Sequence, residues 1–254
     1  MTIRHSRFPH RRRVALAMVV ALALIGAACA DDDEDTAAAT DATGSDDNGT
    51  ADIAAFCDAR VQLEREFNAD QPNVEAVTAL LEDLEASAPS DLAGNASGLA
   101  QVLATAAESG GDPTEDPAFG ENIAPIDEFA LGECGYETVE VTGVDYAFEG
   151  LPETIPAGTT GFRFTNDGAE PHVLVLFRYN EGETAELTDL LAFPEEELAQ
   201  HLTFVGATFA EPGSAGFAEL EPGHYAAICP IPVGGAEDGP PHSMEGMSAE
   251  FEVT

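Results

Sequence analysis

Beyond residue 50, the apolar residues first recur at helical spacing. The apolar stripes cover residues 53–67, 74–84, 92–103 and 123–129. Pro72 opens the second stripe and Pro89 separates it from the third, as expected where helices begin and end. Amphipathic helices must bury their apolar faces against one another. Residues 51–134 are therefore predicted to form a small helical domain.

After Gly135 the apolar pattern changes from helical to alternating, which indicates strands. Short strands are predicted at residues 139–148, 161–165, 173–177, 216–220, 224–229 and 250–253. One helical insertion, at residues 184–200, divides them. Several short strands separated by Pro/Gly turns favour a β-sandwich. The predicted fold class is therefore α+β, with a helical bundle followed by a β-sandwich over residues 135–254.

Residues 1–28 have the pattern of an export signal. Arginines precede an apolar run that is shorter than the ~20 residues of a membrane-spanning helix. The run ends at Cys29, and the Ile25–Cys29 junction resembles the lipobox of bacterial lipoproteins, with Gly26 where Leu is usual. This resemblance implies a lipid on Cys29, and plain secretory cleavage nearby is the alternative. The general secretory and twin-arginine export routes both stay open.

The charge is strongly negative, with Lys+Arg 9 against Asp+Glu 48 and a formal net charge of -39. Loss of residues 1–28 removes five arginines and takes the charge to -44. Residues 29–50 are acidic and poor in apolar side chains, so they are expected to remain a disordered tether. Such a charge disfavours nucleic acid, which is bound through clustered Lys and Arg. It favours a partner protein with a cationic patch.

Four cysteines are present, and Cys29 is assigned to the lipid. Cys57 and Cys134 lie near the two ends of the helical domain, so a disulfide between them would close it. An exported protein can form disulfides, and one of them stabilises a small domain by roughly 2–5 kcal/mol. Cys229 is then left without a partner. Pairing of Cys229 with Cys57 or Cys134 is the alternative, because sequence alone does not fix connectivity.

A candidate metal site is spread over the second half of the chain. His172 precedes one predicted strand, Cys229 ends another, and His242 and Met247 follow in the next loop. One thiolate, two imidazoles and one thioether are the ligand set of a blue-copper site. Zinc is the rival metal, but it rarely takes methionine. Each residue also has an ordinary interpretation, such as a histidine bonded to backbone at a strand end.

Other residues of the same types are weaker candidates. His201 ends the helical insertion and His224 occupies a turn in the predicted pattern. After residue 28 the only methionines are Met244 and Met247, both in the loop after His242. Methionine used as core filler would be scattered along the chain. Met247 is preferred because of its spacing from His242 and its place beside the last strand.

At these residues the chain resembles the cupredoxin family, which includes plastocyanin and azurin. Asn166, Gly168 and Pro171 precede His172 as in the family's first ligand turn. The family's Cys, His and Met cluster is matched by the three later candidate ligands. The resemblance implies a Greek-key β-sandwich, one type 1 copper held by His172, Cys229, His242 and Met247, and one-electron transfer. Val173 stands where the family often has Asn, and the Cys-to-His loop is long.

The sequence thus predicts a signal peptide (1–28), a tether (29–50), a helical domain (51–134) and a cupredoxin-like domain (135–254). No nucleophile triad, phosphate-binding loop or zinc-protease motif is found, so an electron carrier or copper-binding protein is expected and not an enzyme. The expected location is the outer face of the cytoplasmic membrane, through a lipid anchor, with a redox protein as partner. The alternatives are copper carriage or storage without electron transfer, and a metal-free interaction module.

Overall fold

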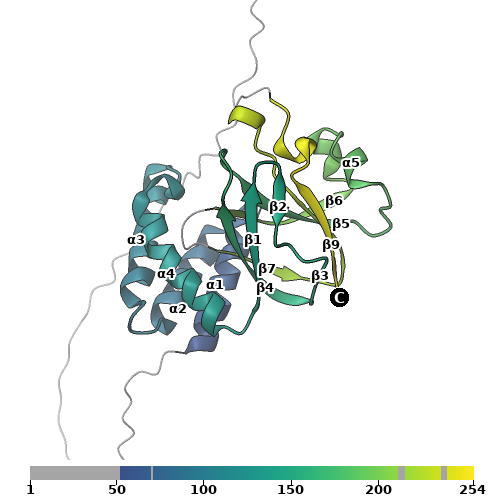
Figure 1. Ribbon diagram of the computed structural model, residues 1–254. Helices are drawn as coiled ribbons and strands as arrows, with labels where there is room; N and C mark the ends of the chain where they lie inside the picture. The colour runs from purple at the N-terminus through teal and green to yellow at the C-terminus, as the bar shows by residue number, and fades with distance from the viewer. Residues whose placement is uncertain (1–51, 70, 211–214, 236–238) are drawn as a thin grey trace, which may run out of the picture.

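A computed structural model describes residues 52–69, 71–210, 215–235 and 239–254. The N-terminal helices gather on one side of a β-sandwich (Figure 1). The expected signal peptide, the tether and Cys29 lie outside the described residues. Within the described part, no helix combines the length and the apolar character that crossing a membrane requires.

The N-terminal part folds as four α-helices and one 3₁₀ turn. These are α1 (Ile53–Phe67), α2 (Val74–Ser87), α3 (Ala93–Ser109), η1 (Pro113–Glu115) and α4 (Pro117–Glu133). Polar side chains cap three of the α-helices at their N-termini: Asp52 accepts from the Ala55 amide, Asn73 from the Glu75 and Ala76 amides, and Asp116 from the Ala118 amide. Such caps satisfy amide groups that have no partner inside the helix. α3 ends at Gly110, which adopts the left-handed conformation with φ 66°.

The bundle core forms where the apolar stripes meet. Phe56, Leu84, Leu99 and Ile126 are fully buried there, one from each α-helix. A disulfide joins Cys57 in α1 to Cys134 directly after α4, so the predicted bridge is confirmed. It closes a loop of 77 residues and links the first helix to the last.

In the described part of the chain, nine strands form the two sheets of the sandwich. They are β1 (Glu137–Val144), β2 (Ala147–Glu149), β3 (Thr154–Ile155), β4 (Gly158–Asn166), β5 (Val173–Tyr179), β6 (Leu202–Phe209), β7 (Gly216–Leu220), β8 (Gly223–Ile228) and β9 (Ser248–Val253). One sheet has the order β2-β1-β4-β7 and the other β3-β9-β8-β5-β6. β1 pairs with β4 and β3 with β9 in parallel, and the other pairs are antiparallel. The predicted α+β class, with a bundle followed by a β-sandwich, is confirmed.

The two sheets bury a common core, and the bundle packs against one of them. Phe162 and Phe164 of β4 face Leu174 of β5 and Phe251 of β9 in this core. A second cluster joins bundle and sandwich: Val61, Ala130, Leu131, Ala215 and Phe217. The helices therefore contact the sandwich through α1, α4 and β7.

Several element boundaries differ from the sequence prediction. The strand predicted at residues 139–148 is a hairpin, since a turn at Asp145 and Tyr146 separates β1 from β2. The helical insertion is two short helices, α5 (Leu187–Leu190) and α6 (Glu195–Leu198). β6 was not predicted, because its alternation is broken by an irregular pairing with β5 at Leu176 and Phe177. His224 lies in β8 and not in a turn.

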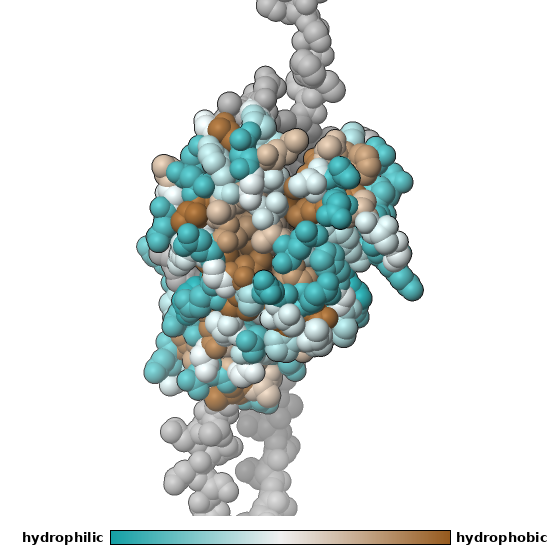
Figure 2. Space-filling view, turned by 45° about the vertical axis from the view of Figure 1, so that its right-hand side comes forward, coloured by the Kyte–Doolittle hydropathy of each residue, from teal (hydrophilic) through white to brown (hydrophobic). Residues whose placement is uncertain are grey.

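The surface is mixed, with hydrophilic residues over much of one face and apolar areas between them (Figure 2). The exposed large apolar side chains are Ile53, Phe67, Phe193, Phe204, Phe209 and Met244. Among them, Met244 belongs to a short 3₁₀ helix, η3 (His242–Glu245). Scattered apolar residues of this kind are ordinary on a protein surface.

Candidate metal centre

The structure brings three of the predicted ligands together in the sandwich. His172 directly precedes β5, Cys229 directly follows β8, and His242 begins η3. Their relative exposures are 3%, 0% and 0%. One donor atom from each lies within 4.8 Å of the others, which makes them a group able to hold a metal ion.

The donor atoms face one another directly. Nδ1 of His172 lies 3.0 Å from Nδ1 of His242, and Sγ of Cys229 lies 3.5 Å from the latter atom. Ligands that share one ion, each at about 2.0–2.3 Å from it, have separations of this size. The three donors therefore converge on one point.

Met247 is fully buried beside Cys229 in the same apolar cluster. The Cys229 amide donates to the Met247 carbonyl at 3.1 Å, and the Met247 amide donates to the His242 carbonyl at 2.9 Å. A side chain at Gly143 would approach the Met247 methyl carbon to 3.2 Å, so the glycine leaves space for this methionine. Backbone bonds thus keep Met247 next to the other candidate ligands.

The long loop between Cys229 and His242 folds back on itself. Pro232 and Pro241 form an isolated bridge, and the Val233 amide donates to the Pro240 carbonyl at 3.0 Å. The His242 amide then donates to the Ile231 carbonyl at 2.9 Å. These contacts close the base of the loop, and they bring His242 back to the end of β8.

The sulfur of Cys229 lies among backbone amides. Burial raises the pKa of the Cys229 thiol, and the amides of Val173 and Ile231, which donate to the sulfur, act against this rise. A buried thiol stays protonated unless a cation stabilises its thiolate. Val173, where the family often has Asn, supplies its backbone amide to the sulfur.

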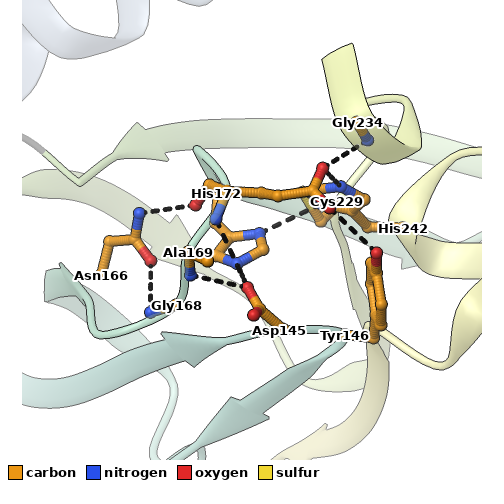
Figure 3. A network of polar contacts seen from close by, with 10 residues as sticks. Asp145, Tyr146, Asn166, Gly168, Ala169, His172, Cys229, Gly234 and His242 are labelled. Carbon is orange, nitrogen blue, oxygen red and sulfur yellow. Dashed lines mark hydrogen bonds and ion pairs between the residues drawn. The ribbon is translucent and has the colours of Figure 1, made fainter. Parts of the chain in front are cut away.

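Two carboxylates lie behind the imidazoles, on the Nε2 side (Figure 3). Oε2 of Glu170 accepts from His242 Nε2 at 3.2 Å. Oδ1 of Asp145 lies 3.4 Å from His172 Nε2, a buried nitrogen that makes no hydrogen bond. Hydrogen bonds from backbone amides are the leading cause that lowers the pKa of each carboxyl, the Ala169 amide for Asp145 and the Gly234 amide for Glu170.

These contacts define how the two rings are protonated. With a carboxylate near each Nε2, the ring proton belongs on that nitrogen, and the Nδ1 lone pairs of both histidines point inward. Burial lowers the pKa of His172, so its ring stays neutral near pH 7. Two lone pairs 3.0 Å apart repel each other unless a cation lies between them. The donor set therefore fits a metal ion, and its soft sulfur atoms fit copper.

The weaker histidine candidates lie elsewhere. His201 stacks on Phe193 with ring centroids 5.1 Å apart and contacts Glu183. His224 bonds to Glu250 through one nitrogen and to Glu252 through the other, at 2.9 and 2.7 Å. Neither histidine belongs to a metal-binding group among the described residues.

The sequence prediction missed three residues of this site: Asp145, Tyr146 and Glu170. The Tyr146 ring packs edge-on against His242 with centroids 5.2 Å apart, and its hydroxyl donates to Glu170 Oε1 at 3.0 Å. Glu170 stands two positions before His172, in the turn already singled out. The other two form the turn between β1 and β2, which the alternating pattern alone does not reveal.

Comparison with solved structures finds auracyanins and rusticyanins. An auracyanin from Roseiflexus castenholzii is 22% identical and covers 47% of this chain and 99% of its own, with a TM-score of 0.28. Auracyanin A, a "blue" copper protein from Chloroflexus aurantiacus, is 19% identical over 47% of this chain and 100% of its own, with a TM-score of 0.30. Rusticyanin from Thiobacillus ferrooxidans is 20% identical over 47% and 79%, with a TM-score of 0.28. No family model and no curated protein matches the chain.

Proposed function

We propose that this protein is a type 1 copper protein that carries single electrons outside the cytoplasmic membrane and catalyses no reaction of its own. The observation that supports it best is the convergence of two Nδ1 atoms and one thiol sulfur in a buried pocket of the sandwich. Electron transfer needs no substrate pocket, and His172, Cys229 and His242 are buried.

In this proposal His172, Cys229, His242 and Met247 would hold the copper. Bound copper would accept and release one electron between its two oxidation states. Backbone bonds fix Cys229, His242 and Met247 to one another, so the donors would stay in nearly the same place in both states. Little rearrangement is then needed when an electron arrives or leaves.

The location and the partner are also part of the proposal. Export through residues 1–28 and a lipid on Cys29 would hold the sandwich near the outer face of the membrane. A net charge of -39 favours a redox protein with a cationic patch and disfavours nucleic acid. A Cys29→Ser variant is expected to leave the membrane fraction and appear in the soluble fraction. Retention of this variant in the membrane fraction would contradict the lipid anchor.

The decisive experiment is to load the purified protein with copper and record its visible spectrum. One copper per chain and an intense blue band that reductant bleaches are expected, and Cys229→Ala should lose the band. Met247→Leu should shift the reduction potential, because a thioether ligand tunes it. Met244→Leu is the matched control: Met244 is exposed, so its loss should leave spectrum and potential unchanged.

Other results would redirect the assignment. Stoichiometric copper without the blue band would favour copper carriage or storage. A melting temperature that copper does not change would favour a metal-free interaction module, because a ligand that binds only the folded state must stabilise it.

A further inference from the structure

The two carboxylates behind the candidate ligands come from different segments and meet one imidazole each. Asp145 belongs to the turn between β1 and β2, and Glu170 to the loop before β5. We propose that Glu170 and Asp145 are positioning residues that hold both imidazoles with Nδ1 toward Cys229 and lower the reduction potential of the copper bound there. This inference rests on the proposed function.

Glu170 is held from three directions. Oε2 accepts from His242 Nε2 and from the Gly234 amide, and Oε1 accepts from the Tyr146 hydroxyl. Its side chain is 23% exposed, so water reaches only part of it. Three donors hold a carboxylate in one orientation. It therefore fixes the His242 ring rather than following it.

Tyr146, which belongs to this network, adopts an unfavourable backbone conformation. Its φ is 64°, which makes it the one non-glycine residue with positive φ in the described part of the chain. A bulky residue rarely adopts this conformation, because its Cβ crowds the following carbonyl oxygen. In this conformation the Tyr146 hydroxyl reaches Glu170 and the ring packs edge-on against His242. Strain of this kind gathers at functional sites.

Asp145, the neighbour of Tyr146 in the same turn, lies beside the other histidine, His172. Its Oδ1 accepts from the Ala169 amide at 2.8 Å and lies 3.4 Å from His172 Nε2. Space for this approach exists only because residue 168 is glycine. A Cβ at Gly168 would lie 2.5 Å from Asp145 Oδ1 and 2.6 Å from His172 Nε2. One two-residue turn thus reaches the back of both ligand rings.

The electrostatic consequence has a definite sign. A negative charge behind an imidazole makes the ring more basic and stabilises the more highly charged metal ion. Cu(II) gains more from Glu170 and Asp145 than Cu(I) does, so the reduction potential falls. Loss of such a partner typically costs 10–100-fold in metal affinity. A tenfold loss for Cu(II) relative to Cu(I) equals a rise of about 59 mV for a one-electron couple.

The test compares the reduction potentials and the Cu(II) and Cu(I) affinities of four copper-loaded proteins. They are the wild type, Glu170→Gln, Asp145→Asn and Glu137→Gln. The first two substitutions remove a charge and keep the shape. Glu137→Gln removes the same charge from the exposed start of β1, about 25 Å along the strand from Asp145. That distance exceeds the screening length of roughly 8 Å.

Glu170→Gln is expected to raise the potential by about 59 mV or more through a tenfold loss of Cu(II) affinity relative to Cu(I). Asp145→Asn should raise it less, because its carboxylate is farther from the ring and 45% exposed. Glu137→Gln should leave it unchanged. If Glu170→Gln and Asp145→Asn both keep the wild-type potential, this inference is wrong and the copper function stands. Wild-type protein that takes up no copper would overturn both.

Discussion

Replacing Arg60 by methionine tests how the helical bundle is held against the sandwich. Arg60 is 2% exposed, although it is charged, and its Nε lies 2.6 Å from Asp127 Oδ1. Its guanidinium also donates to the Ala215 carbonyl and lies over the Phe217 ring, 4.8 Å from the centroid. One side chain of α1 thus contacts α4 and the residues at the start of β7.

The size of the effect follows from what the substitution leaves behind. Asp127 is 1% exposed and, among the described residues, would keep only the Ala215 amide as a donor, at 2.9 Å. Removing one partner of a buried ion pair costs about 3–5 kcal/mol. A domain is stabilised by about 5–15 kcal/mol in total. Arg60→Met is therefore expected to remove a large fraction of the free energy of unfolding.

The loss should depend on pH in one direction. Burial raises the pKa of Asp127 to about 6, and the charge of Arg60 acts against this rise. Without Arg60 the pKa rises further, so the folded variant binds a proton that the unfolded chain does not. Stability then falls as pH increases. The deficit of Arg60→Met relative to the wild type should be smaller at pH 5 than at pH 8.

Urea unfolding followed by circular dichroism at both pH values measures these differences. Arg65→Met is the matched control: Arg65 lies in the same helix, but its pair with Glu219 is exposed and 3.3 Å long. Such pairs contribute less than about 1 kcal/mol. Arg60→Met/Asp127→Leu should recover much of the loss, because apolar replacements of a buried pair are often neutral. Equal effects of Arg60→Met and Arg65→Met would refute the reasoning.

Three further predictions address other parts of the molecule. Cys57→Ser/Cys134→Ser should lower the free energy of unfolding by about 4 kcal/mol, since the bridge closes a loop of 77 residues; an unchanged urea midpoint would contradict this. For His224, burial lowers the pKa, but the hydrogen bonds and charges of Glu250 and Glu252 outweigh it and raise the pKa overall. The contribution of His224 to the free energy of unfolding is therefore full below about pH 6.5. It is lost as the pH rises through the folded-state pKa of His224. His224→Gln should flatten the decline in stability between pH 6 and 8. The change should be less than about 1 kcal/mol, because the side chain is 39% exposed. A decline as steep as in the wild type would count against this prediction. Gly168→Ala should weaken copper binding at least about tenfold, because its Cβ would collide with Asp145 and His172. Gly120→Ala in α4, where a Cβ meets nothing within 4 Å, is the control and should bind copper normally.

The helical part was predictable because its signals are local. Apolar spacing marked the stripes, and prolines marked two boundaries between them. α4 is longer than its predicted core of residues 123–129, because Asp116 caps a helix that starts at Pro117. Apolar spacing alone does not mark where such a capped helix begins.

The strands of the sandwich could be predicted in outline, but the way they pair could not. Strands that are apolar runs, such as β5, were found. β6 was missed because its pairing with β5 skips Val205, which breaks the two-residue period. The Asp145–Tyr146 turn was missed because Tyr146 adopts a conformation that its residue type disfavours. Its function in the site depends on contacts with Glu170 and His172, which lie 24 and more residues away. A local sequence pattern does not predict contacts between residues so far apart in the chain.

The register of the second sheet explains why widely separated residues could be identified as a set. β8 lies between β5 and β9, with Ile228 opposite both Val175 and Ser248. Cys229 and Met247, which adjoin these positions, must therefore lie together, and His172 enters the same sheet end at the start of β5. Only the position of His242 depends on a loop, and the bridge between Pro232 and Pro241 constrains that loop. Three of the four candidate ligands are thus placed by strand pairing, which also secures the fold.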